Sequence, residues 1–266
     1  MKRRPRKLGK YRIGKRLGTG GFATVYQARD TVEGVPVALK VPHVDLVHGS
    51  ALEDFRREIR LTASLEHPNI LSLKNADVVD GRLVVAYPLG DETLGDRMRR
   101  RIAVSTCLDL IGQMLAALAY AHSRRVIHCD VKPENLILFH GNRLRLTDFG
   151  IARVALRTMP ASGSGTVGYV APEQAMGKPS FRSDVFSAGL VAFRLLSGQL
   201  PEWPFEWPLP GTARLRQKVP ATFVKFLQRA LRVDHRKRFR DGAAMASAFE
   251  DVLPATLRFL ARKRRR

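Results

Sequence analysis

Short apolar runs bounded by polar or turn-forming residues dominate the first third of the chain. This pattern is typical of β-strands, and it predicts strands over residues 11–17, 24–29, 35–41, 70–76 and 82–87. Residues 52–65 instead carry apolar residues every three or four positions among charges, which predicts one amphipathic helix. Asp80 and Gly81 form a signal for a hairpin turn between the last two strands.

The pattern changes after Pro88, Leu89 and Gly90, which are typical of a linker. Apolar residues then recur at helical spacing over residues 107–123, 186–197, 221–231 and 243–252, and the Pro- and Trp-rich residues 200–211 predict a loop. A strand-rich first third followed by a helix-rich remainder predicts an α+β protein in two lobes. The predicted parts are a basic arm at 1–10, an N-terminal lobe at 11–87, a C-terminal lobe at 88–255 and a basic tail at 256–266.

The charge of the chain is concentrated at its ends. The 266 residues include 46 Lys and Arg against 24 Asp and Glu, a net charge of +22. Residues 1–16 and 256–266 together hold 15 basic residues and no acidic one, which leaves 31 basic and 24 acidic residues in between. The simplest interpretation is that both ends are solvated, disordered tails. The alternative is an electrostatic contact with nucleic acid, an anionic membrane or an acidic partner.

The cysteines and the apolar segments bear on location. Cys107 and Cys129 are the only cysteines, and they have neither the number for a disulfide framework nor the spacing of a zinc site. The basic N-terminus is not followed by the apolar core of a secretory signal, and no window approaches 18 uninterrupted apolar residues. We therefore expect a cytoplasmic, soluble protein.

The segment with the most specific chemistry is HCDVKPEN at residues 128–135, followed by Asp148, Phe149 and Gly150. Asp130 offers a carboxylate that can orient a hydroxyl, and Lys132 offers a cation for a moving phosphoryl group. Asn135 and Asp148 offer oxygen ligands for Mg²⁺. A lone Asp-Phe-Gly is weak, because it is also plausible turn chemistry, but the spacing HxDxKxxN before it is a strong signal.

Two motifs in the first third fit the same chemistry. Residues 18–25, GTGGFATV, place glycines between two predicted strands, where the backbone can approach phosphate oxygens closely. A plain tight hairpin explains them about equally well, and a dinucleotide-binding turn does not, because a strand follows instead of a helix. Lys40 ends a predicted strand and Glu58 lies on the predicted helix. Each could be an ordinary surface charge, but as an ion pair they could hold Lys40 against phosphates.

A further motif lies after Asp148, Phe149 and Gly150. Ala171, Pro172 and Glu173 follow the Ser-, Gly- and Thr-rich stretch that begins at residue 150. In this order and spacing, the motifs resemble those of protein kinases of the eukaryotic-like type, and most of all bacterial Ser/Thr protein kinases, from about Tyr11 to about Leu253. The resemblance implies a bilobal fold, with ATP and Mg²⁺ (or Mn²⁺) as cofactors. It also implies transfer of the γ-phosphoryl group to Ser or Thr hydroxyls of proteins, autophosphorylation and a role in signalling.

The resemblance also implies a role for individual residues. Asp130 would be the catalytic base, and Lys132 would contact the γ-phosphate. Glu173 would pair with Arg238, and Asp184 would brace the catalytic loop, residues 128–135. Asn135 and Asp148 would hold the metal, and the regulatory or substrate-binding residues of the loop would be Ser162, Ser164 and Thr166. The nucleotide-binding residues would be Leu17, Gly18, Gly20, Gly21, Val25, Ala38, Lys40, Glu58, Val85, Tyr87 and Ile137.

Cys129 departs from the family pattern, which has arginine at this position. In the family this arginine meets a phosphorylated residue of the activation segment, and cysteine has no charge with which to do so. We therefore hypothesise that phosphorylation of this segment is less necessary here. Cys129 acting as a nucleophile with His128 is disfavoured, because the family histidine is a core residue. A pseudokinase that signals as an ATP-binding scaffold is the alternative function, and it is disfavoured because the catalytic residues are all present. The short stretch between Gly198 and Val219 predicts a reduced helix there.

Overall fold

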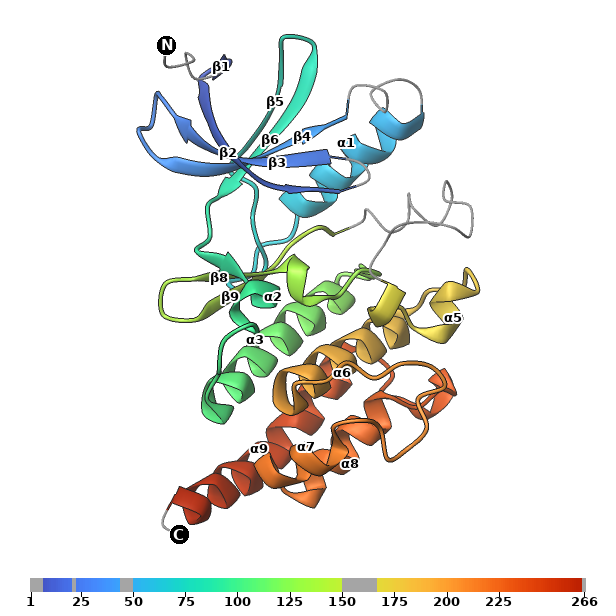
Figure 1. Cartoon of the computed structure of the whole chain (residues 1–266). Helices are drawn as coiled ribbons and strands as arrows, with labels where there is room; N and C mark the ends of the chain where they lie inside the picture. The colour runs from blue at the N-terminus through green and yellow to red at the C-terminus, as the bar shows by residue number, and fades with distance from the viewer. Residues whose placement is uncertain (1–6, 21–22, 44–49, 150–166, 265–266) are drawn as a thin grey trace. The chain divides into compact units, whose positions relative to one another are not determined.

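The computed structural model describes residues 7–20, 23–43, 50–149 and 167–264 (Figure 1). The chain divides into two compact units. The N-terminal unit comprises Met1–His67 and Leu71–Asp91, and the C-terminal unit comprises Pro68–Ile70 and Glu92–Arg266. The boundary therefore falls after Asp91 rather than after Tyr87, and the C-terminal unit takes a short segment from within the predicted N-terminal lobe.

The N-terminal unit is built on one six-stranded sheet with the strand order β1-β2-β3-β4-β6-β5 (Figure 1). All neighbouring strands in it are antiparallel. Asp80 and Gly81 join β5 to β6 and have φ values of 51° and 73°, as the tightest hairpin turns require. The strands are β1 (Lys7–Leu8), β2 (Tyr11–Thr19), β3 (Ala23–Asp30), β4 (Pro36–Pro42), β5 (Asn75–Val79) and β6 (Arg82–Pro88).

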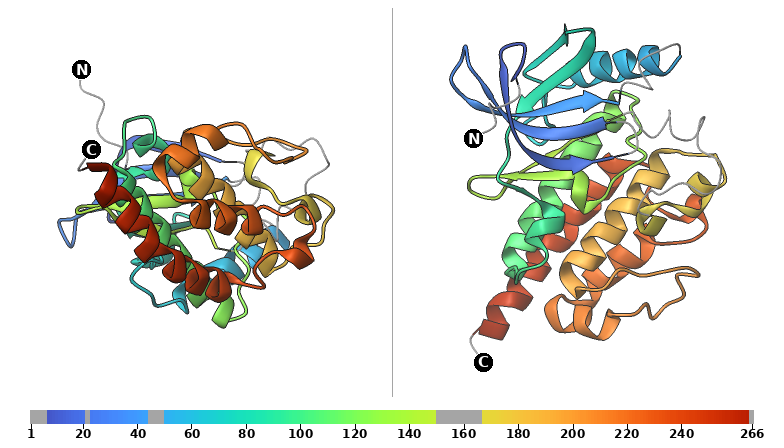
Figure 2. Two further views of the ribbon diagram at one scale, coloured as in Figure 1. Left: turned by 90° about the horizontal axis from the view of Figure 1, so that it is seen from below. Right: turned by 45° about the horizontal axis from the view of Figure 1, so that its top comes forward.

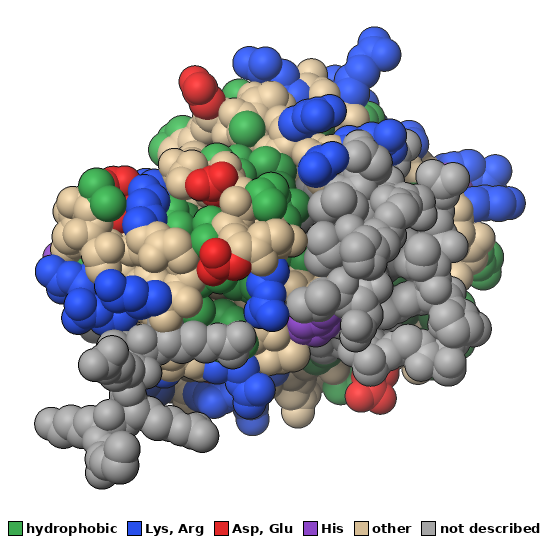
Figure 3. Space-filling view, turned by 90° about the horizontal axis from the view of Figure 1, so that it is seen from above, with side chains coloured by type: hydrophobic (Ala, Val, Ile, Leu, Met, Phe, Trp, Pro, Cys, Tyr) green, Lys and Arg blue, Asp and Glu red, His purple; other side chains and the backbone are tan. Residues whose placement is uncertain are grey.

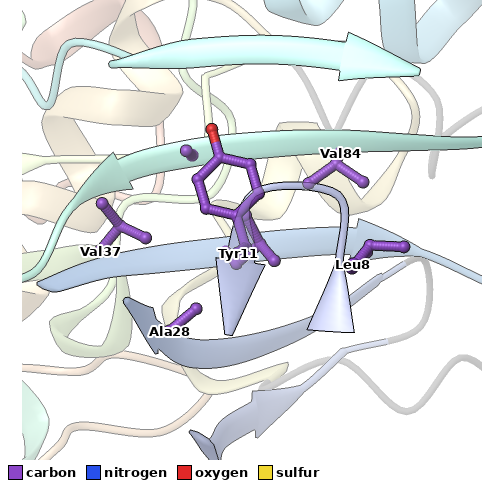
Figure 4. Close-up of a cluster of buried hydrophobic side chains, with 7 residues drawn as sticks. Leu8, Tyr11, Ala28, Val37 and Val84 are labelled. Atoms are coloured by element: carbon purple, nitrogen blue, oxygen red, sulfur yellow. The ribbon is translucent and has the colours of Figure 1, made fainter. Parts of the chain in front are cut away.

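The hydrophobic core of the N-terminal unit lies on one face of this sheet, where side chains from several strands meet around Tyr11 (Figure 4). Side chains alternate between the two faces of a strand, so Val37 and Leu39 enter the core while Ala38 and Lys40 belong to the opposite face. The other face of the sheet therefore carries a second set of side chains, among which Lys40 and Val85 are also buried. The buried core members are Leu8, Tyr11, Ala28, Val37, Leu39, Val84 and Ala86.

Most of the elements predicted for this unit are confirmed, including the helix, which is α1 (Ser50–Ala63). The strand predicted over residues 70–76 is wrong, because β5 begins only at Asn75. Ile70 makes an isolated bridge to Leu146, and it is apolar because it is buried in a connection rather than paired within the sheet. The predicted N-terminal arm is also partly structured, since β1 pairs with β2 and Leu8 is buried in the core.

The C-terminal unit is mainly helical, and α3, α6 and α9 lie side by side in it (Figures 1 and 2). The helices predicted over residues 107–123, 186–197 and 221–231 are confirmed as α3, α6 and α8. The longer described helices are α3 (Val104–Ser123), α6 (Phe181–Ser197), α7 (Thr212–Lys218), α8 (Ala221–Ala230) and α9 (Gly242–Arg264). The shorter ones are α2 (Leu94–Arg97) and α5 (Pro172–Ala175), with the 3-10 turns η2 (Pro133–Asn135), η3 (Val167–Tyr169) and η4 (His235–Lys237).

The unit also contains a small antiparallel sheet of β7 (Glu92–Thr93), β8 (Leu136–Phe139) and β9 (Arg143–Leu146). The sequence analysis did not predict it. Gly141 and Asn142, with φ values of 76° and 57°, form the turn between β8 and β9 and were the available signal. This hairpin matters because it connects the two motifs with the most specific chemistry.

Helix α3 is the core helix of the C-terminal unit. By length and composition alone it is long and apolar enough to cross a membrane, and among the described helices it is the one that passes this test. Ten of its residues are buried, and it packs against α6, α9 and β9. Such packing is what the core helix of a globular domain requires.

The last helix is longer than predicted. Pro254 lies inside α9, and its missing N–H removes one helical hydrogen bond, which is why the pattern suggested an end near residue 252. The helix nevertheless continues to Arg264, so the predicted basic tail is largely the last turns of α9 and not a disordered segment. The reduced helix expected between Gly198 and Val219 is α7, with seven residues.

Basic residues are also distributed over the body of the protein. On the surface viewed in Figure 3, Lys and Arg side chains outnumber Asp and Glu side chains among the described residues. Between residues 17 and 255 the sequence also has 31 basic residues against 24 acidic ones, so the net positive charge is not confined to the two ends of the chain.

Candidate active site

The register of the N-terminal sheet places five of the eleven predicted nucleotide-binding residues on one face. Val25 on β3 pairs with Lys40 on β4, and Lys40 pairs in turn with Val85 on β6. Ala38 and Tyr87 form the neighbouring pair of β4 and β6. Residues paired across strands share a face of the sheet, so these five lie opposite the core side chains of the same strands. Alternation alone therefore separates a predicted ligand face from a packing face.

The glycine turn between β2 and β3 stands at one end of this face. Gly18 pairs with Val25, and the turn is closed by a 2.9 Å hydrogen bond from the Gly20 N–H to the Ala23 carbonyl. A side chain at Gly18 would meet no described atom within 4 Å, and Leu17 beside it is 44% exposed. Packing within the described protein thus gives no reason for glycine at this position, whereas close approach of a ligand to the backbone would.

Some of the predicted residues fall elsewhere. Gly21, Gly150 and the side chain of Glu58 lie outside the described residues, so the predicted Lys40–Glu58 ion pair stays a prediction. The same holds for the three predicted regulatory residues, Ser162, Ser164 and Thr166. Ile137 belongs to the C-terminal unit, where it lies on β8 between the buried Leu136 and Leu138 and faces the other way.

His128 is fully buried and its ring is fixed by two hydrogen bonds. The backbone N–H of Asp130 donates to Nδ1 at 3.1 Å, so the ring proton is on Nε2, which donates to the Thr147 carbonyl at 2.8 Å. The ring also meets Phe149 edge-on, with centroids 4.7 Å apart. His128 therefore links the catalytic loop to the residues around Asp148, and its nitrogens are both occupied, which argues against a nucleophilic pair with Cys129.

Asp130 lies between two donors from its own loop. Its Oδ2 is 2.7 Å from the Lys132 ammonium and accepts a 2.8 Å hydrogen bond from the Asn135 side-chain N–H. The same Asn135 nitrogen donates to the Asp130 carbonyl at 2.8 Å. The predicted catalytic base, cation and amide are thus brought together, and the carboxylate remains 35% exposed. Because these bonds use the amide nitrogen of Asn135, its amide oxygen is the atom suited to a metal ion.

Asp148 lies in the left-handed region of the backbone, with φ of 64°, next to the fully buried Phe149. Such a conformation is uncommon for residues other than glycine, although aspartate and asparagine adopt it more often than most, and strained examples cluster at functional sites. Together Asp148 and Asn135 offer a carboxylate and an amide oxygen. No cluster of three or more His, Cys, Asp or Glu suited to a metal occurs among the described residues. Two hard oxygen donors suit Mg²⁺, which keeps several waters and commonly takes its remaining ligands from phosphates.

A buried carboxylate holds the backbone of the catalytic loop. Asp184, which lies in the first turn of α6 and is fully buried, accepts hydrogen bonds from the backbone N–H of His128 at 2.7 Å and of Cys129 at 2.8 Å. A third bond comes from His122 Nε2 at 2.9 Å. The bracing role predicted for Asp184 is confirmed, and it stabilises the left-handed conformation of Cys129, whose φ is 65°.

The sequence analysis missed His122. Its Nδ1 accepts the backbone N–H of Gly242 at 2.7 Å, so the ring is neutral and donates through Nε2 to Asp184. Gly242 can come this close only because it lacks a side chain, since a Cβ there would lie 2.7 Å from the carbonyl carbon of Leu118. The start of α9 is thereby connected to the catalytic loop through α3 and α6. A histidine in the last turn of an apolar helix was the one signal available.

Glu173 and Arg238 form the predicted buried ion pair, with an Nη1–Oε1 distance of 2.7 Å and a second bond of 3.0 Å from Nη2 to Oε2. Ser183 Oγ also donates to Glu173 Oε1 at 2.7 Å. Burial by itself raises the pKa of Glu173, but the hydrogen bonds from Arg238 and Ser183 lower it more, so the net pKa lies below its ordinary value of 4.5. This pair fixes the start of α5, directly after the described end of the activation segment.

The two cysteines are buried and neither is in a disulfide. Burial raises the pKa of the Cys107 thiol to about 11, and its Sγ points to the Leu195 carbonyl at 3.7 Å. A thiol in such surroundings is inert, because the thiolate is the reactive form.

The chain matches the protein kinase domain family over residues 11–249. The probable serine/threonine-protein kinase PknB of Lactococcus lactis is 31% identical to it, over 93% of this chain and 42% of that protein. The serine/threonine-protein kinase PrkC of Bacillus subtilis is 33% identical, over 73% of this chain and 31% of that protein. The chain thus spans less than half the length of these relatives.

The fold is also similar to that of a solved protein kinase domain. The crystal structure of the PknI kinase domain of Mycobacterium tuberculosis aligns with a TM-score of 0.71 and 26% identity, covering 93% of this chain and 98% of that one. Its match includes both the β-sheet unit and the helical unit, in agreement with the predicted α+β fold. The chain belongs to the protein kinase domain family, among catalytic domains of the bacterial Ser/Thr type.

Proposed function

We propose that this chain is an active Ser/Thr protein kinase domain that transfers the γ-phosphoryl group of ATP to hydroxyls of protein substrates. The observation that carries the proposal is the arrangement at Asp130. Its carboxylate is held by Lys132 and Asn135 at 2.7 and 2.8 Å, while the loop backbone before it is held by the buried Asp184. Catalysis of phosphoryl transfer depends mainly on such positioning and on electrostatic stabilisation.

In this proposal Asp130 accepts a hydrogen bond from the Ser or Thr hydroxyl of the substrate and aims its oxygen at the γ-phosphorus. A bond forms from that oxygen to phosphorus, the bond from phosphorus to the β-phosphate oxygen breaks, and the hydroxyl proton passes to Asp130. Lys132, 19% exposed at its side chain, is placed to turn from Asp130 to the transferring phosphoryl group. ADP and a phosphorylated hydroxyl are the products.

The residues that would bind ATP and its metal are those that the resemblance to protein kinases implies. Protein kinases generally use ATP with Mg²⁺, and Mn²⁺ can substitute. The Asn135 oxygen and the Asp148 carboxylate would hold the metal, which when bound supplies positive charge to the phosphates. Gly18 and Gly20 would let the backbone approach the phosphates, and Lys40 would contact them from the ligand face of the sheet.

Ser and Thr are the proposed acceptors for two reasons. Lys132 stands two residues after Asp130, as in the Ser/Thr kinases that the chain resembles. The two curated relatives reported above are both named serine/threonine-protein kinases. Autophosphorylation and a role in signalling belong to the same proposal, as does a cytoplasmic location.

The proposal is tested by the turnover of ATP with a Ser- and Thr-containing protein, measured on the wild type and on Asp148→Asn. We expect Mg²⁺-dependent phosphorylation of Ser or Thr by the wild type and a loss to background in the variant, with ATP still bound by both. An ATP-binding scaffold, the alternative function, would instead bind ATP without turnover in the wild type.

The basic ends support one further proposal about partners. The last turns of α9 carry Arg258, Arg262 and Lys263, all exposed, and residues 1–16 carry nine more cations. We expect them to bind nucleic acid, an anionic membrane or an acidic partner through charge. Affinity for DNA, RNA or anionic vesicles across a salt series, with and without residues 1–10 and 258–266, tests this. A weak salt dependence that survives the truncation would contradict it.

A further inference from the structure

Gln174 is a buried polar side chain that the kinase motifs do not assign. It lies on α5, directly after Glu173, and only 4% of it is exposed. Its side-chain Nε2 donates a 2.5 Å hydrogen bond to the backbone carbonyl of Cys129. The bond therefore connects the helix that follows the activation segment to the residue immediately before the proposed catalytic base.

This contact acts on one particular peptide unit. The carbonyl oxygen of Cys129 and the N–H of Asp130 belong to the same planar group, so fixing both ends fixes its orientation. Gln174 holds the oxygen end, and His128 Nδ1 accepts from the N–H end at 3.1 Å. The Cys129 N–H is in turn held by Asp184 at 2.8 Å. Hydrogen bonds to Gln174, His128 and Asp184 thereby fix the backbone conformation immediately before Asp130.

The local backbone needs such support. Cys129 has φ of 65°, a conformation that costs of the order of 1–3 kcal/mol for a residue with a side chain. Its two backbone polar groups are held by side chains from α6 and α5, respectively. Loss of either bond would allow the peptide unit to rotate toward a less strained conformation, and the Asp130 carboxylate would move with it.

The side-chain oxygen of Gln174 indicates that the hydrogen-bond donor, Nε2, is the functional part of this amide. Its Oε1 is buried and has no hydrogen-bond partner among the described residues. An unsatisfied buried oxygen costs roughly 1–3 kcal/mol, which an apolar side chain of similar size would avoid. Turning the amide over would place Oε1 against the Cys129 carbonyl, so the observed orientation is the one that provides a donor.

We propose that Gln174 is a positioning residue for the phosphotransfer reaction, acting through the Cys129 carbonyl to hold Asp130 in its productive place. This inference rests on the proposed kinase function. It also names the element that performs the positioning. Gln174 directly follows Glu173, which is bound to Arg238, so the start of α5 acts on the catalytic loop through a neutral amide.

The test compares two substitutions of Gln174 with a matched control. Gln174→Leu removes both the donor and the unsatisfied oxygen. Gln174→Glu keeps the shape but sets an oxygen against the Cys129 carbonyl. The control is Ser187→Ala. Ser187 is a buried residue of α6, and its hydroxyl donates a 2.7 Å hydrogen bond to the backbone carbonyl of Tyr169. For each protein, kcat, the KM for ATP and Tm are measured with Mg²⁺ and one Ser-containing substrate.

We expect kcat to fall about 10-fold in Gln174→Leu and up to about 100-fold in Gln174→Glu, with the KM for ATP changed less than about twofold, since misplacement of a catalytic group acts on the chemical step. The Tm of Gln174→Leu should be no lower than that of Ser187→Ala, whose kcat should stay near the wild-type value. A purely structural role would instead make kcat follow Tm through the three variants.

Two results would count against the inference. Normal kcat in both Gln174 variants, beside an active wild type, would remove the positioning role and leave the proposed function intact. An equal loss of kcat in Ser187→Ala at equal Tm would show that Gln174 only stabilises the fold. An inactive wild type is a distinct result, because it contradicts the proposed function itself.

Discussion

Two ion pairs of the C-terminal unit have the same length and opposite surroundings. Arg238 and Glu173 are 2.7 Å apart with side chains 0% and 11% exposed, and Lys132 and Asp130 are 2.7 Å apart with side chains 19% and 35% exposed. The first pair is dry and the second is in contact with solvent. Distance alone therefore does not tell what an ion pair does.

The partners of each pair explain the difference. Arg238 also donates to the carbonyls of Arg182, Arg232 and Val233, and its guanidinium lies 4.4 Å from the centre of the Phe186 ring. All of its donors are thus used inside the fold. Among the described residues, the Lys132 ammonium is paired with Asp130 alone, which leaves donors for a ligand. A saturated pair stabilises a structure, whereas an unsaturated and accessible pair can exchange partners during a reaction.

The largest expected effect is on the open pair. Asp130→Asn removes the charge that we propose accepts the substrate proton, and we expect kcat to fall about 10²- to 10⁴-fold with little change in the free energy of unfolding. Steady-state kinetics and urea denaturation measure the two quantities. Asp109→Asn, which alters an exposed carboxylate on α3, is the control and should change neither. A kcat for Asp130→Asn close to that of the control would contradict this assignment.

The dry pair should respond in the opposite way. Arg238→Met leaves the Glu173 carboxylate buried without its cation, and we expect a loss of about 3–5 kcal/mol in the free energy of unfolding. Arg236→Met, two residues earlier, removes an exposed partner of Asp234 and should cost less than about 1 kcal/mol. Denaturant unfolding of both variants is the measurement. Similar losses in the two would mean that burial does not distinguish these arginines.

The pH dependence sharpens the comparison further. The folded-state pKa of Glu173 is below its ordinary value, so this carboxylate stabilises the fold above about pH 4.5 and loses that contribution as the pH falls through its folded-state pKa. Glu173→Gln should therefore be about 1–3 kcal/mol less stable than the wild type at pH 7, because the charge-assisted bonds are lost. This difference in the free energy of unfolding should become smaller in acid, which denaturant unfolding of both proteins at several pH values would measure. A gap that is constant from pH 7 to pH 3 would contradict the lowered pKa.

The smallest effect is expected where this chain lacks an ion pair of the family, the one between an arginine at position 129 and a phosphorylated residue. An arginine at position 129 would bind a phosphorylated activation-segment residue, and Cys129 cannot. Ser162→Ala and Ser164→Ala should therefore leave kcat within about twofold of the wild type, in assays of freshly prepared and phosphatase-treated protein. Activity reduced to background in either variant would show that phosphorylation is needed despite Cys129. Thr166→Ala is not informative here, because the resemblance to the family also implies that Thr166 hydrogen-bonds Asp130 and Lys132.

How far the sequence determines this picture can be argued from particular residues. The strand and helix periods predicted the main elements, and the spacing from His128 to Asp148 pointed to the site. The resemblance to protein kinases implied the Glu173–Arg238 pair and the bracing role of Asp184, and the structure shows both contacts. The strand at residues 70–76 was mispredicted, because apolar residues are buried in connections as well as in strands. Pro254 concealed the true length of α9.

The contacts that hold the loop were beyond a sequence reading for a physical reason. Gly242 and His122 are 120 residues apart, and Gln174 and Cys129 are 45 apart. Such bonds join one side chain to one backbone atom, and they produce no periodic pattern in the chain. Only the packing of α3, α5, α6 and α9 brings the partners together.

The most direct test of the account uses Lys132→Met beside Arg238→Met, with kcat and the free energy of unfolding measured for both. The account predicts that Lys132→Met loses about 100-fold or more in kcat and less than about 1 kcal/mol of stability, because its pair is accessible and unsaturated. Arg238→Met should lose several times more stability. A Lys132→Met protein that keeps its kcat, or that unfolds as easily as Arg238→Met, would contradict the claim that the two pairs serve chemistry and fold separately.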